Sequence, residues 1–458
     1  MGWSVPTPIL DMNASSLITR LAEAFSDRQL FLVGGSVRDQ LLGRDDRDLD
    51  FATDARPEEI RARVEPWGDS VWLVGEKFGT VGMMLEGVKA EITTFRSDTY
   101  DLVSRKPEVA FGDSIYEDLA RRDFTINAMA RALPEGGLLD PFGGQEDLAE
   151  RLVRFVGEPA QRIVEDPLRM LRGVRFCAQL GFELEPVTAA GIAEHAAEIQ
   201  RISWERVRDE FDGILTSPQP KEGLRLLLDL GLAQYLLPEL ERLHLPEPAR
   251  YQMKDVLEHT LDTVALVPPE KVLRYAALLH DIAKPEAYSA DEAGVHFYRH
   301  EEASAERARE ILLRLRQPSE FVAEVTALVR DHLRVPFYTS EWSASALRRL
   351  MFELGDRLEA NMILSDADVR ASDPRDYEEF RARMEELRRR IEEQGEASEL
   401  ARMRPLLDGD EIMALLNIPP GPKVGEVQRF LLDQQIEEKL ASKEEAMEAV
   451  RREFGGAG

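Results

Sequence analysis

The sequence predicts an α+β protein, in which a mixed α/β head is followed by helical domains. Three observations support this. The runs that are typical of strands end at Phe95, the hydrophobic spacing beyond Glu150 is helical almost throughout, and 458 residues are too many for one ordinary core. We therefore expect a head at residues 1–150, a helical neck at 151–245, a histidine-bearing helical domain at 246–375 and a helical tail at 376–458.

The head is predicted to contain a small sheet with helices beside it. A polar segment, Tyr100–Pro107, interrupts the head as a loop. The expected helices are Leu17–Phe25 and Pro57–Val64, and the expected strands are Leu30–Val33, Leu49–Ala52, Val71–Val74, Thr80–Leu85 and Ala90–Phe95.

The helical part is divided by turn signals and by one concentration of histidines. Five of the seven histidines lie within Asp255–Leu333. A charged helix rich in Arg and Glu is expected at Tyr377–Glu399. The turn signals are at Gly181, Ser217–Pro220, Pro268–Pro269 and Pro419–Pro422.

The composition is that of a soluble globular protein, with 43% hydrophobic and 31% charged residues. No apolar run approaches the roughly 20 residues of a membrane helix, and the start MGWSVPTPILDMNASS lacks the pattern of a secretory signal. The single cysteine, Cys177, excludes an internal disulfide and is typical of a reducing compartment. We expect a cytoplasmic protein without a membrane partner.

The net charge of −28 argues against a protein that binds nucleic acid over its whole surface. A local basic strip is still compatible with this charge. From Arg151 to Glu210 the chain has nine arginines and ten acidic residues, a net charge of only −1, and the arginines are clustered.

The stretch FLVGGSVRDQLLGRDDRDLDFAT, residues 31–53, combines a glycine turn with a cation and two carboxylates. Gly34 and Gly35 end a predicted strand where a helix begins, so backbone N–H groups can approach a phosphate closely. Arg38, one turn into that helix, could bind the same phosphates. Asp48 and Asp50 are two apart on a strand and face one side, where a divalent cation would relieve their repulsion. These parts suit metal-assisted transfer from a nucleoside triphosphate.

The full pattern resembles the signature of the class II tRNA nucleotidyltransferases, the CCA-adding enzymes, whose relatives include bacterial poly(A) polymerases. Further motifs match in the same order over roughly the first 240 residues and more weakly to the tail. They are EITTFR (Glu91–Arg96), RRDFTINAMA (Arg121–Ala130), EDPLRMLRGVRF (Glu165–Phe176) and RISWERVRDEF (Arg201–Phe211). The resemblance implies a nucleotidyltransferase head of the polymerase-beta-like type.

The resemblance also implies roles for residues of the head. Glu91 would be the third carboxylate, either a general base for a primer 3′-hydroxyl or a further metal ligand. Arg122 would contact the triphosphate. Asp123 and Asn127, four residues apart and expected on one face of a helical turn, would recognise a ribose hydroxyl.

The neck helix is expected to select the nucleotide. Asp166, Arg169, Arg172 and Arg175 are spaced by three and would form one strip. Cytosine and adenine each offer an amino donor beside a ring-nitrogen acceptor, which a carboxylate and a guanidinium complement, whereas guanine and uracil present the opposite order. The resemblance implies that Asp166 and Arg169 act as a protein template for CTP and ATP and that Arg172 and Arg175 approach the nucleotide. An Asp–Arg helix pair that only adds about 0.3–0.5 kcal/mol of stability is the structural alternative.

The loop after Glu91 bears on which nucleotides are added. Members of the family that add A need a flexible loop there, and RSDTYDLVSRKP (Arg96–Pro107) has full length, with Tyr100 and Arg105. This favours addition of A. An enzyme that adds only A would look nearly the same.

The histidines resemble those of an HD metal-dependent phosphohydrolase domain, in the order His259, His280–Asp281 and Asp368. His300 and His332 lie between, as in HD domains that hold two metals. Imidazole and carboxylate ligands suit Mn, Fe, Ni, Co or Mg, so the sequence does not fix the metal. Lys284 could hold a phosphate oxygen.

The tail resembles the tRNA-binding tail of these enzymes in two segments, LLDGDEI (Leu406–Ile412) and Gly421–Gly425.

The predicted function is template-independent addition of C and A to the 3′ end of tRNA from CTP and ATP. Mg²⁺ would be held by Asp48 and Asp50 and a second divalent metal by the HD site. The alternatives are addition of CC only or A only, a poly(A) polymerase, and a protein whose main activity is the HD phosphohydrolase.

Overall fold

The computed structural model describes residues 12–44, 48–74, 79–98, 109–112, 114–134, 136–245, 255–291, 294–372, 374–394, 403–437 and 439–455. The chain forms two compact units, Met1–Leu236 and Leu237–Gly458. The first unit combines the predicted head with most of the predicted neck, while the boundaries between the four predicted domains stay a prediction. Among the described residues, none of the helices is long and apolar enough to cross a membrane.

The first unit is built on a mixed sheet of seven strands in the order β3-β4-β5-β2-β1-β8-β9. β2 and β5 are parallel, and the other neighbours are antiparallel. Leu49 is buried between the exposed Asp48 and Asp50, so both aspartates face one side, as expected. The strands are β1 (Leu30–Val33), β2 (Asp48–Thr53), β3 (Ser70–Val74), β4 (Thr80–Leu85), β5 (Val88–Thr94), β8 (Ala130–Ala132) and β9 (Leu138–Leu139).

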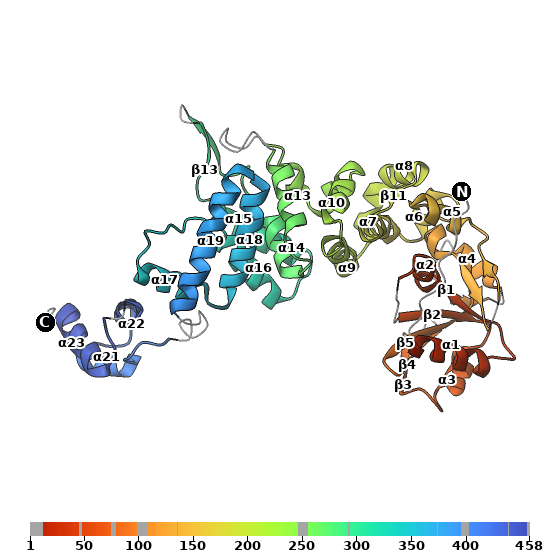
Figure 1. The fold of residues 1–458 in the computed structure, drawn as a ribbon, viewed down its shortest axis with the longest axis horizontal. Helices are drawn as coiled ribbons and strands as arrows, with labels where there is room; N and C mark the ends of the chain where they lie inside the picture. Colours follow the sequence, from red (N-terminus) through yellow and green to blue (C-terminus); the bar gives the residue numbers. More distant parts are fainter. Residues whose placement is uncertain are drawn as a thin grey trace. The chain divides into compact units, whose positions relative to one another are not determined.

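Helices cover this sheet and continue beyond it (Figure 1). The sheet strands expected from the sequence agree with those observed to within two residues, and the expected helix Pro57–Val64 is found with the same bounds. The first helix begins at Met12, earlier than predicted. The helices are α1 (Met12–Ala24), α2 (Gly35–Leu41), α3 (Pro57–Val64), α4 (Ile115–Ala120), α5 (Gly144–Glu150), α6 (Pro159–Glu165), α7 (Leu168–Leu180), α8 (Pro186–His195), α9 (Trp204–Leu215), α10 (Pro220–Asp229) and α11 (Ala233–Leu236).

Aromatic contacts hold the sheet segment to the helical segment within the first unit. The ring of Phe124 stacks on Phe155 at a centroid distance of 4.9 Å and packs edge-on against Phe176 at 5.6 Å. Phe124 is fully buried. Each such pair adds about 0.5–1.5 kcal/mol beyond the burial of area, so the residues around Phe124 are held firmly against α7.

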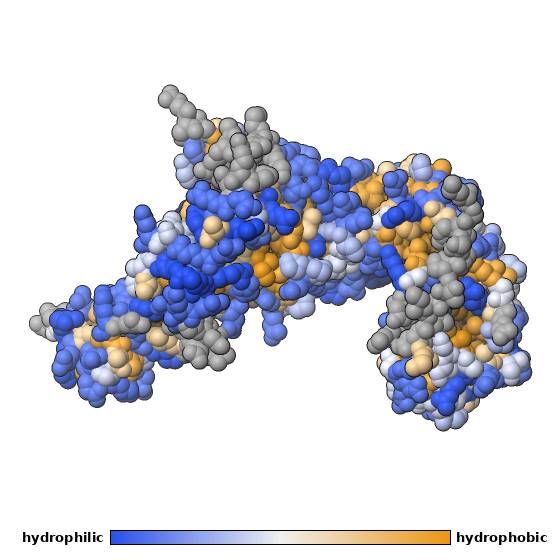
Figure 2. Space-filling view, viewed as in Figure 1, coloured by the Kyte–Doolittle hydropathy of each residue, from blue (hydrophilic) through white to orange (hydrophobic). Residues whose placement is uncertain are grey.

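The described residues of the second unit are helical apart from loops and the hairpin of β12 (Tyr288–Asp291) and β13 (Gly294–Phe297). Five helices, α13, α14, α15, α16 and α18, pack on one another, and α17, α18 and α19 share an apolar core. The surface over α19 is strongly hydrophilic in Figure 2, as the predicted charged helix requires. The helices are α12 (Pro238–Glu241), α13 (Val256–Leu266), α14 (Lys271–Leu279), α15 (His300–Arg314), α16 (Ser319–Asp331), α17 (Ala344–Leu354), α18 (Leu358–Ser372), α19 (Pro374–Gln394), α21 (Gly409–Leu416), α22 (Pro422–Ile436) and α23 (Lys443–Phe454).

Candidate functional site

The glycine turn between β1 and α2 lets a neighbouring guanidinium group lie close to the backbone. Gly34 has φ 67°, a left-handed conformation that favours glycine. A Cβ built on Gly34 would lie 2.5 Å from a guanidinium nitrogen of Arg122, whereas one on Gly35 would lie 3.6 Å from Arg38. Any side chain at Gly34 would therefore displace Arg122 from the turn.

Two guanidinium groups converge on this turn. Arg38 donates to Asn127 Oδ1 at 2.7 Å, and Arg122 donates to Asp118 Oδ2 at 3.2 Å. Burial alone would raise the pKa of Asp118, but Arg122 and Arg121 outweigh it and hold that pKa below its usual value. The ionised Asp118 fixes Arg122 where an anion at the glycine turn would meet it.

The three predicted carboxylates lie on two neighbouring strands. In the parallel register of β2 and β5, Asp50 is the partner of Glu91 and Asp48 is the partner of Lys89. The side chains of these four residues therefore share one face of the sheet. Among the described residues, the oxygens of Asp48, Asp50 and Glu91 do not all lie within 4.8 Å of one another, so the group is more open than a closed metal site.

Lys89, which the motif reading did not single out, is a cation close to two of these acids. Its Nζ lies 2.8 Å from Glu91 Oε1 and 4.0 Å from Asp48 Oδ1. The hydrogen bond to Glu91 raises the pKa of Lys89. The site thus attracts a cation, and carboxylate oxygens are the ligands that Mg²⁺ prefers.

Replacing Lys89 with methionine is expected to tighten binding of a divalent cation at these carboxylates by about tenfold, because it removes a nearby positive charge. Mn²⁺ binding can be followed by electron paramagnetic resonance in chains that also carry Asp281→Asn, which weakens the second candidate site described below. Lys423→Met, in the other compact unit, is the matched control. Unchanged or weaker Mn²⁺ binding in Lys89→Met would contradict this prediction.

The predicted ribose-binding pair is brought together, but not on a helical turn. Asp123 precedes a short 3₁₀ helix, Thr125–Asn127, and Asn127 donates to Asp123 Oδ1 at 3.4 Å. The expectation of one helical face was wrong, because Phe124 is extended and inserts its ring into the core. Arg172 donates to Asp123 Oδ2 at 2.6 Å and, against the effect of burial, lowers the pKa of Asp123.

The predicted base-selecting residues are separated by a break between two helices. α6 ends at Glu165 and α7 begins at Leu168, so Asp166 is extended and lies outside the expected continuous strip. Pro167 explains the break, because the residue before a proline is disfavoured in helical conformation. Asp166 caps the start of α7 by accepting from Leu168 N at 3.2 Å.

Three partners that the sequence reading missed hold Asp166 and Arg169. Arg206, on α9, donates to Asp166 Oδ2 at 2.7 Å. Arg169 donates to Glu165 and also to the backbone oxygen of Arg121 at 2.9 Å. All three lie in quoted motifs, but the contacts of Arg206 and of the Arg121 backbone join segments distant in the chain, which spacing does not reveal.

The remaining predicted arginines of α7 share one acidic partner. Arg175 donates to Glu210 Oε2 at 2.6 Å, and Arg172 lies 3.9 Å from Glu210 Oε1. Three guanidinium groups, those of Arg38, Arg172 and Arg175, lie 4.7 to 5.5 Å from the ring centre of Phe176. The ring and Glu210 together orient these cations.

The second unit gathers all six predicted histidine and aspartate ligands into one buried cluster. Helix ends deliver most of them, which explains why residues far apart in sequence meet. They form two groups whose candidate ligand atoms lie within 4.8 Å of one another: His259 (α13), His280 (after α14) and Asp368 (α18), and Asp281, His300 (start of α15) and His332 (after α16).

The imidazoles are oriented as metal ligands usually are. His280, His300 and His332 each place Nδ1 2.7 to 2.9 Å from a backbone carbonyl oxygen. A carbonyl only accepts, so Nδ1 donates, and Nε2 is directed into the cluster. His259 Nε2 lies 3.0 Å from Asp368 Oδ1.

The electrostatics of the cluster favour a cation. Burial would lower the pKa of His280, but Asp281 outweighs it and raises that pKa to about 9. Burial and the neighbouring His280 lower the pKa of His332 to about 4. Asp281 Oδ1 is buried without a hydrogen-bond partner among the described residues, although His300 Nε2 lies 3.2 Å away. An orphaned carboxylate oxygen among imidazoles fits a divalent cation.

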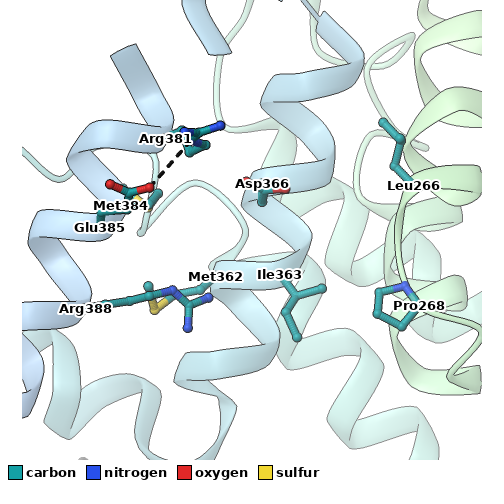
Figure 3. Close-up of a pocket in the computed structure, with 9 residues that line it drawn as sticks. All are labelled: Leu266, Pro268, Met362, Ile363, Asp366, Arg381, Met384, Glu385 and Arg388. Atoms are coloured by element: carbon teal, nitrogen blue, oxygen red, sulfur yellow. Dashed lines mark ion pairs between the residues drawn. The ribbon is translucent and has the colours of Figure 1, made fainter. Parts of the chain in front are cut away.

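A separate cavity of about 350 Å³ lies between α18, α19 and the segment after α13 (Figure 3). Asp366 lines it, and Asp368, two residues later on α18, points roughly 200° away around the helix. The cavity and the cluster therefore lie on different sides of α18. The two arginines that line the cavity already have acidic partners, Arg381 with Glu385 at 3.5 Å and Arg388 with Glu359 at 3.1 Å. We therefore do not assign a catalytic site to this cavity.

The predicted loop and the predicted tail segments stand differently in the structure. Tyr100–Pro107, including Arg105, lies outside the described residues. In the tail, Asp408 forms a capping box with Glu411 at the start of α21, and Gly421 precedes α22. Both segments thus begin helices of the tail core.

Comparison with known proteins gives matches along most of the chain. Residues 30–154 match the poly A polymerase head domain, residues 181–243 match the probable RNA and SrmB-binding site of polymerase A, and residues 256–373 match the HD domain.

Two relatives match nearly end to end. The A-adding tRNA nucleotidyltransferase of Deinococcus radiodurans is 34% identical, over 92% of this chain and 94% of its own. The CC-adding tRNA nucleotidyltransferase of Thermus thermophilus is also 34% identical, over 92% and 93%. Relatives named CCA-adding enzymes match over about half of their own length. The crystal structure of the Bacillus stearothermophilus CCA-adding enzyme in complex with CTP is similar with a TM-score of 0.71 and 29% identity, covering 97% of this chain and 98% of that one.

Proposed function

The chain belongs to the family of tRNA nucleotidyltransferases, and on that basis we propose that it adds C and A, in the order CCA, to the 3′ end of tRNA from CTP and ATP. The observation that chiefly supports this proposal is the register of β2 and β5, which pairs Asp50 with Glu91 and puts Asp48 on the same face. A reducing cytoplasmic setting is part of the proposal, since the chain has a single cysteine, Cys177, which is a free thiol.

In the proposed reaction, the 3′-hydroxyl oxygen of the tRNA forms a bond to the α-phosphorus of the nucleotide. The bond from that phosphorus to the bridging oxygen breaks, and pyrophosphate leaves. Glu91 accepts the hydroxyl proton. Asp48 and Asp50 would hold Mg²⁺, which supplies charge stabilisation at the transferring phosphate.

The nucleotide would be held along the first unit from phosphate to base. Gly34, Gly35, Arg38 and Arg122 would bind the triphosphate through backbone N–H and guanidinium groups. The other predicted contacts are Asp123 and Asn127 to the ribose, Asp166 and Arg169 to the base edge, and Arg172 and Arg175 near the nucleotide.

The base choice tests this proposal. A tRNA transcript that lacks CCA and one that ends in CC are each incubated with one of the four nucleoside triphosphates and Mg²⁺. We expect CTP to extend the first and ATP to extend the second. UTP and GTP should be used about 10³-fold or more slowly, because uracil and guanine would place a carbonyl acceptor against the Asp166 carboxylate and a ring N–H donor against the Arg169 guanidinium. Equal use of all four triphosphates would refute it.

Narrower activities are the alternatives. Addition of A only and addition of CC only are the named activities of the two relatives that match nearly end to end, at the same identity. A poly(A) polymerase is a more distant alternative. The length of the product separates these cases.

We propose a second activity for the other unit, hydrolysis of a phosphate ester at the histidine cluster. Its support is the convergence of six side chains, five buried and Asp368 partly buried, into two groups around an oxygen of Asp281 that has no hydrogen-bond partner among the described residues. A divalent metal held there would activate water. Lys284, whose Nζ lies 2.7 Å from Asp281 Oδ2, is placed to hold a phosphate oxygen.

Removing divalent metal is expected to abolish this hydrolysis. Dialysis against a chelator should lower hydrolysis of bis(p-nitrophenyl) phosphate by about 10²-fold or more, because the water loses its activating cation. Adding Mn²⁺, Co²⁺, Ni²⁺ or Mg²⁺ singly should show which metal restores it. Asp281→Asn should not be restored by any of them, and activity that persists in the metal-free chain would contradict the assignment.

A further inference from the structure

The ring of Phe176 lies where cations from two segments of the first unit meet. Phe176 is on α7, which packs beside α9 (Figure 1), and it is only 6% exposed. Three guanidinium groups lie close to the centre of this ring, that of Arg38 at 5.3 Å, that of Arg172 at 5.5 Å and that of Arg175 at 4.7 Å. Arg38 comes from α2, beside the glycine turn, whereas the other two come from α7 itself. One aromatic ring is therefore shared by a predicted triphosphate contact and by two predicted contacts of the neck.

The arrangement brings three like charges together at the ring. Each of the three arginines also forms an ion pair within 2.7 Å, and these pairs are Arg38 with Asp39, Arg172 with Asp123 and Arg175 with Glu210. The guanidinium groups still repel one another. The negative face of an aromatic ring attracts cations, so Phe176 favours their convergence. An aliphatic side chain at this position would fill the space without this attraction.

The ring of Phe176 is itself held in place by packing. It meets Phe124 edge-on, at a centroid distance of 5.6 Å and an interplanar angle of 83°. Phe124 lies between Asp123 and the short 3₁₀ helix that contains Asn127. A Cβ on Gly173 of α7 would lie only 3.2 Å from the ring of Phe124, so the two rings meet where α7 offers room. The position of the Phe176 ring relative to the predicted ribose contacts is thus fixed by the fold.

We propose that Phe176 is a positioning residue for the nucleotide, whose ring holds three guanidinium groups together so that they bind the triphosphate as one set. This inference deepens the proposed function of nucleotide addition and rests on it. Phe176 acts through the arginines, because its ring has no hydrogen-bonding group to offer a phosphate. The affinity for the triphosphate should therefore depend on the negative face of the ring as well as on its shape. The choice of base should not depend on the ring, since that choice is assigned to Asp166 and Arg169.

Fluorination separates the charge distribution of the ring from its shape. The full chain is made with a phenylalanine that carries one, two or three ring fluorine atoms at position 176, because fluorine weakens the negative face and adds little volume. Binding of CTP with Mg²⁺ is measured by equilibrium dialysis without tRNA, so that no transfer takes place. We expect Kd to rise with each fluorine atom, by about fivefold in total.

The same series at Phe155 is the matched control. Phe155 is also buried and also packs against Phe124, at a centroid distance of 4.9 Å, but it stacks on that ring instead of meeting the three arginines. Its fluorinated forms should bind CTP with unchanged Kd. Equal Kd values along the series at Phe176, or equal increases at both positions, would overturn the proposal, because the ring would then act only through its packing.

Nucleotide addition gives a second readout. Phe176→Leu should raise KM for CTP and for ATP about fivefold or more and leave kcat within about twofold, whereas Phe176→Tyr retains the ring and should retain KM. The preference for CTP over UTP should stay the same in both variants. A fall in kcat at unchanged KM would overturn the positioning role. The fluorinated chains give the same comparison if Phe176→Leu does not fold.

Failure of this inference and failure of the proposed function give different results. If the unmodified chain binds CTP and extends tRNA but Kd is equal along the series at Phe176, only the role of the ring is rejected. If the unmodified chain neither binds CTP nor extends tRNA, the proposed function is rejected and the inference falls with it.

Discussion

Replacing Asp50 with asparagine is expected to lower the rate of nucleotide addition by about 10³-fold or more, because the neutral amide is a poor ligand for the cation that stabilises the transferring phosphate. Asp50 lies opposite Glu91 on the parallel neighbouring strand. Its replacement therefore removes the carboxylate that lies between Asp48 and Glu91 on this face of the sheet. The measurement is the single-turnover rate of labelled AMP incorporation into a tRNA that ends in CC.

Asp209→Asn is the matched control for this change. Asp209 is 65% exposed on α9 and pairs with its neighbour Arg208, so its replacement should leave the rate within about twofold, as is usual for exposed pairs of small energy. Hydrolysis by the second unit should be unaffected by either variant. A loss of less than about tenfold in Asp50→Asn would show that Asp50 is not a metal ligand.

Replacing Asp166 with asparagine is expected to change which base is accepted. The carboxylate can only accept hydrogen bonds and so suits the amino groups of cytosine and adenine, whereas the amide can also donate to the carbonyl of uracil. We expect kcat/KM for CTP to fall about 10²-fold and the preference for CTP over UTP to shrink by a similar factor.

Arg206→Ala separates positioning from recognition in the same assay. Arg206 donates to Asp166 Oδ2 but offers the base nothing that would favour uracil. Its loss should lower kcat/KM for CTP about tenfold, the effect of one charged hydrogen bond, while the preference for CTP over UTP stays high. If Asp166→Asn retained the full preference for CTP, Asp166 would not read the base.

Local patterns predicted much of the fold. The alternation around Leu49 gave the strand and the shared face of Asp48 and Asp50, and the paired glycines marked the end of β1 and the start of α2. These features depend on period and local turn chemistry, which sequence carries directly. The histidine cluster was predicted in a different way, from the resemblance of its His and Asp order to HD domains, and the structure brings those residues together.

Contacts between separate helices and strands could not be predicted from local sequence patterns. The pairing of Arg206 with Asp166 depends on how α9 packs on α7, and the position of Lys89 beside Glu91 depends on strand register. Pro167 is the one local signal that could have predicted the break before α7. The helical spacing of Asp166 with the arginines predicts one strip, and that prediction is wrong at Asp166, because Pro167 interrupts the helix there.

The most direct test of the central claim is primer extension on three tRNA transcripts, ending before CC, after CC and after CCA, each with CTP, ATP or both. We expect the first to be extended to CCA and then to stop, the second to take one A, and the third to remain unchanged. Arrest at CC, or extension of the second transcript alone, would mean a CC-adding or an A-adding enzyme. A long A tail would mean a poly(A) polymerase, and no extension of any transcript would contradict the assignment of nucleotide addition to this chain.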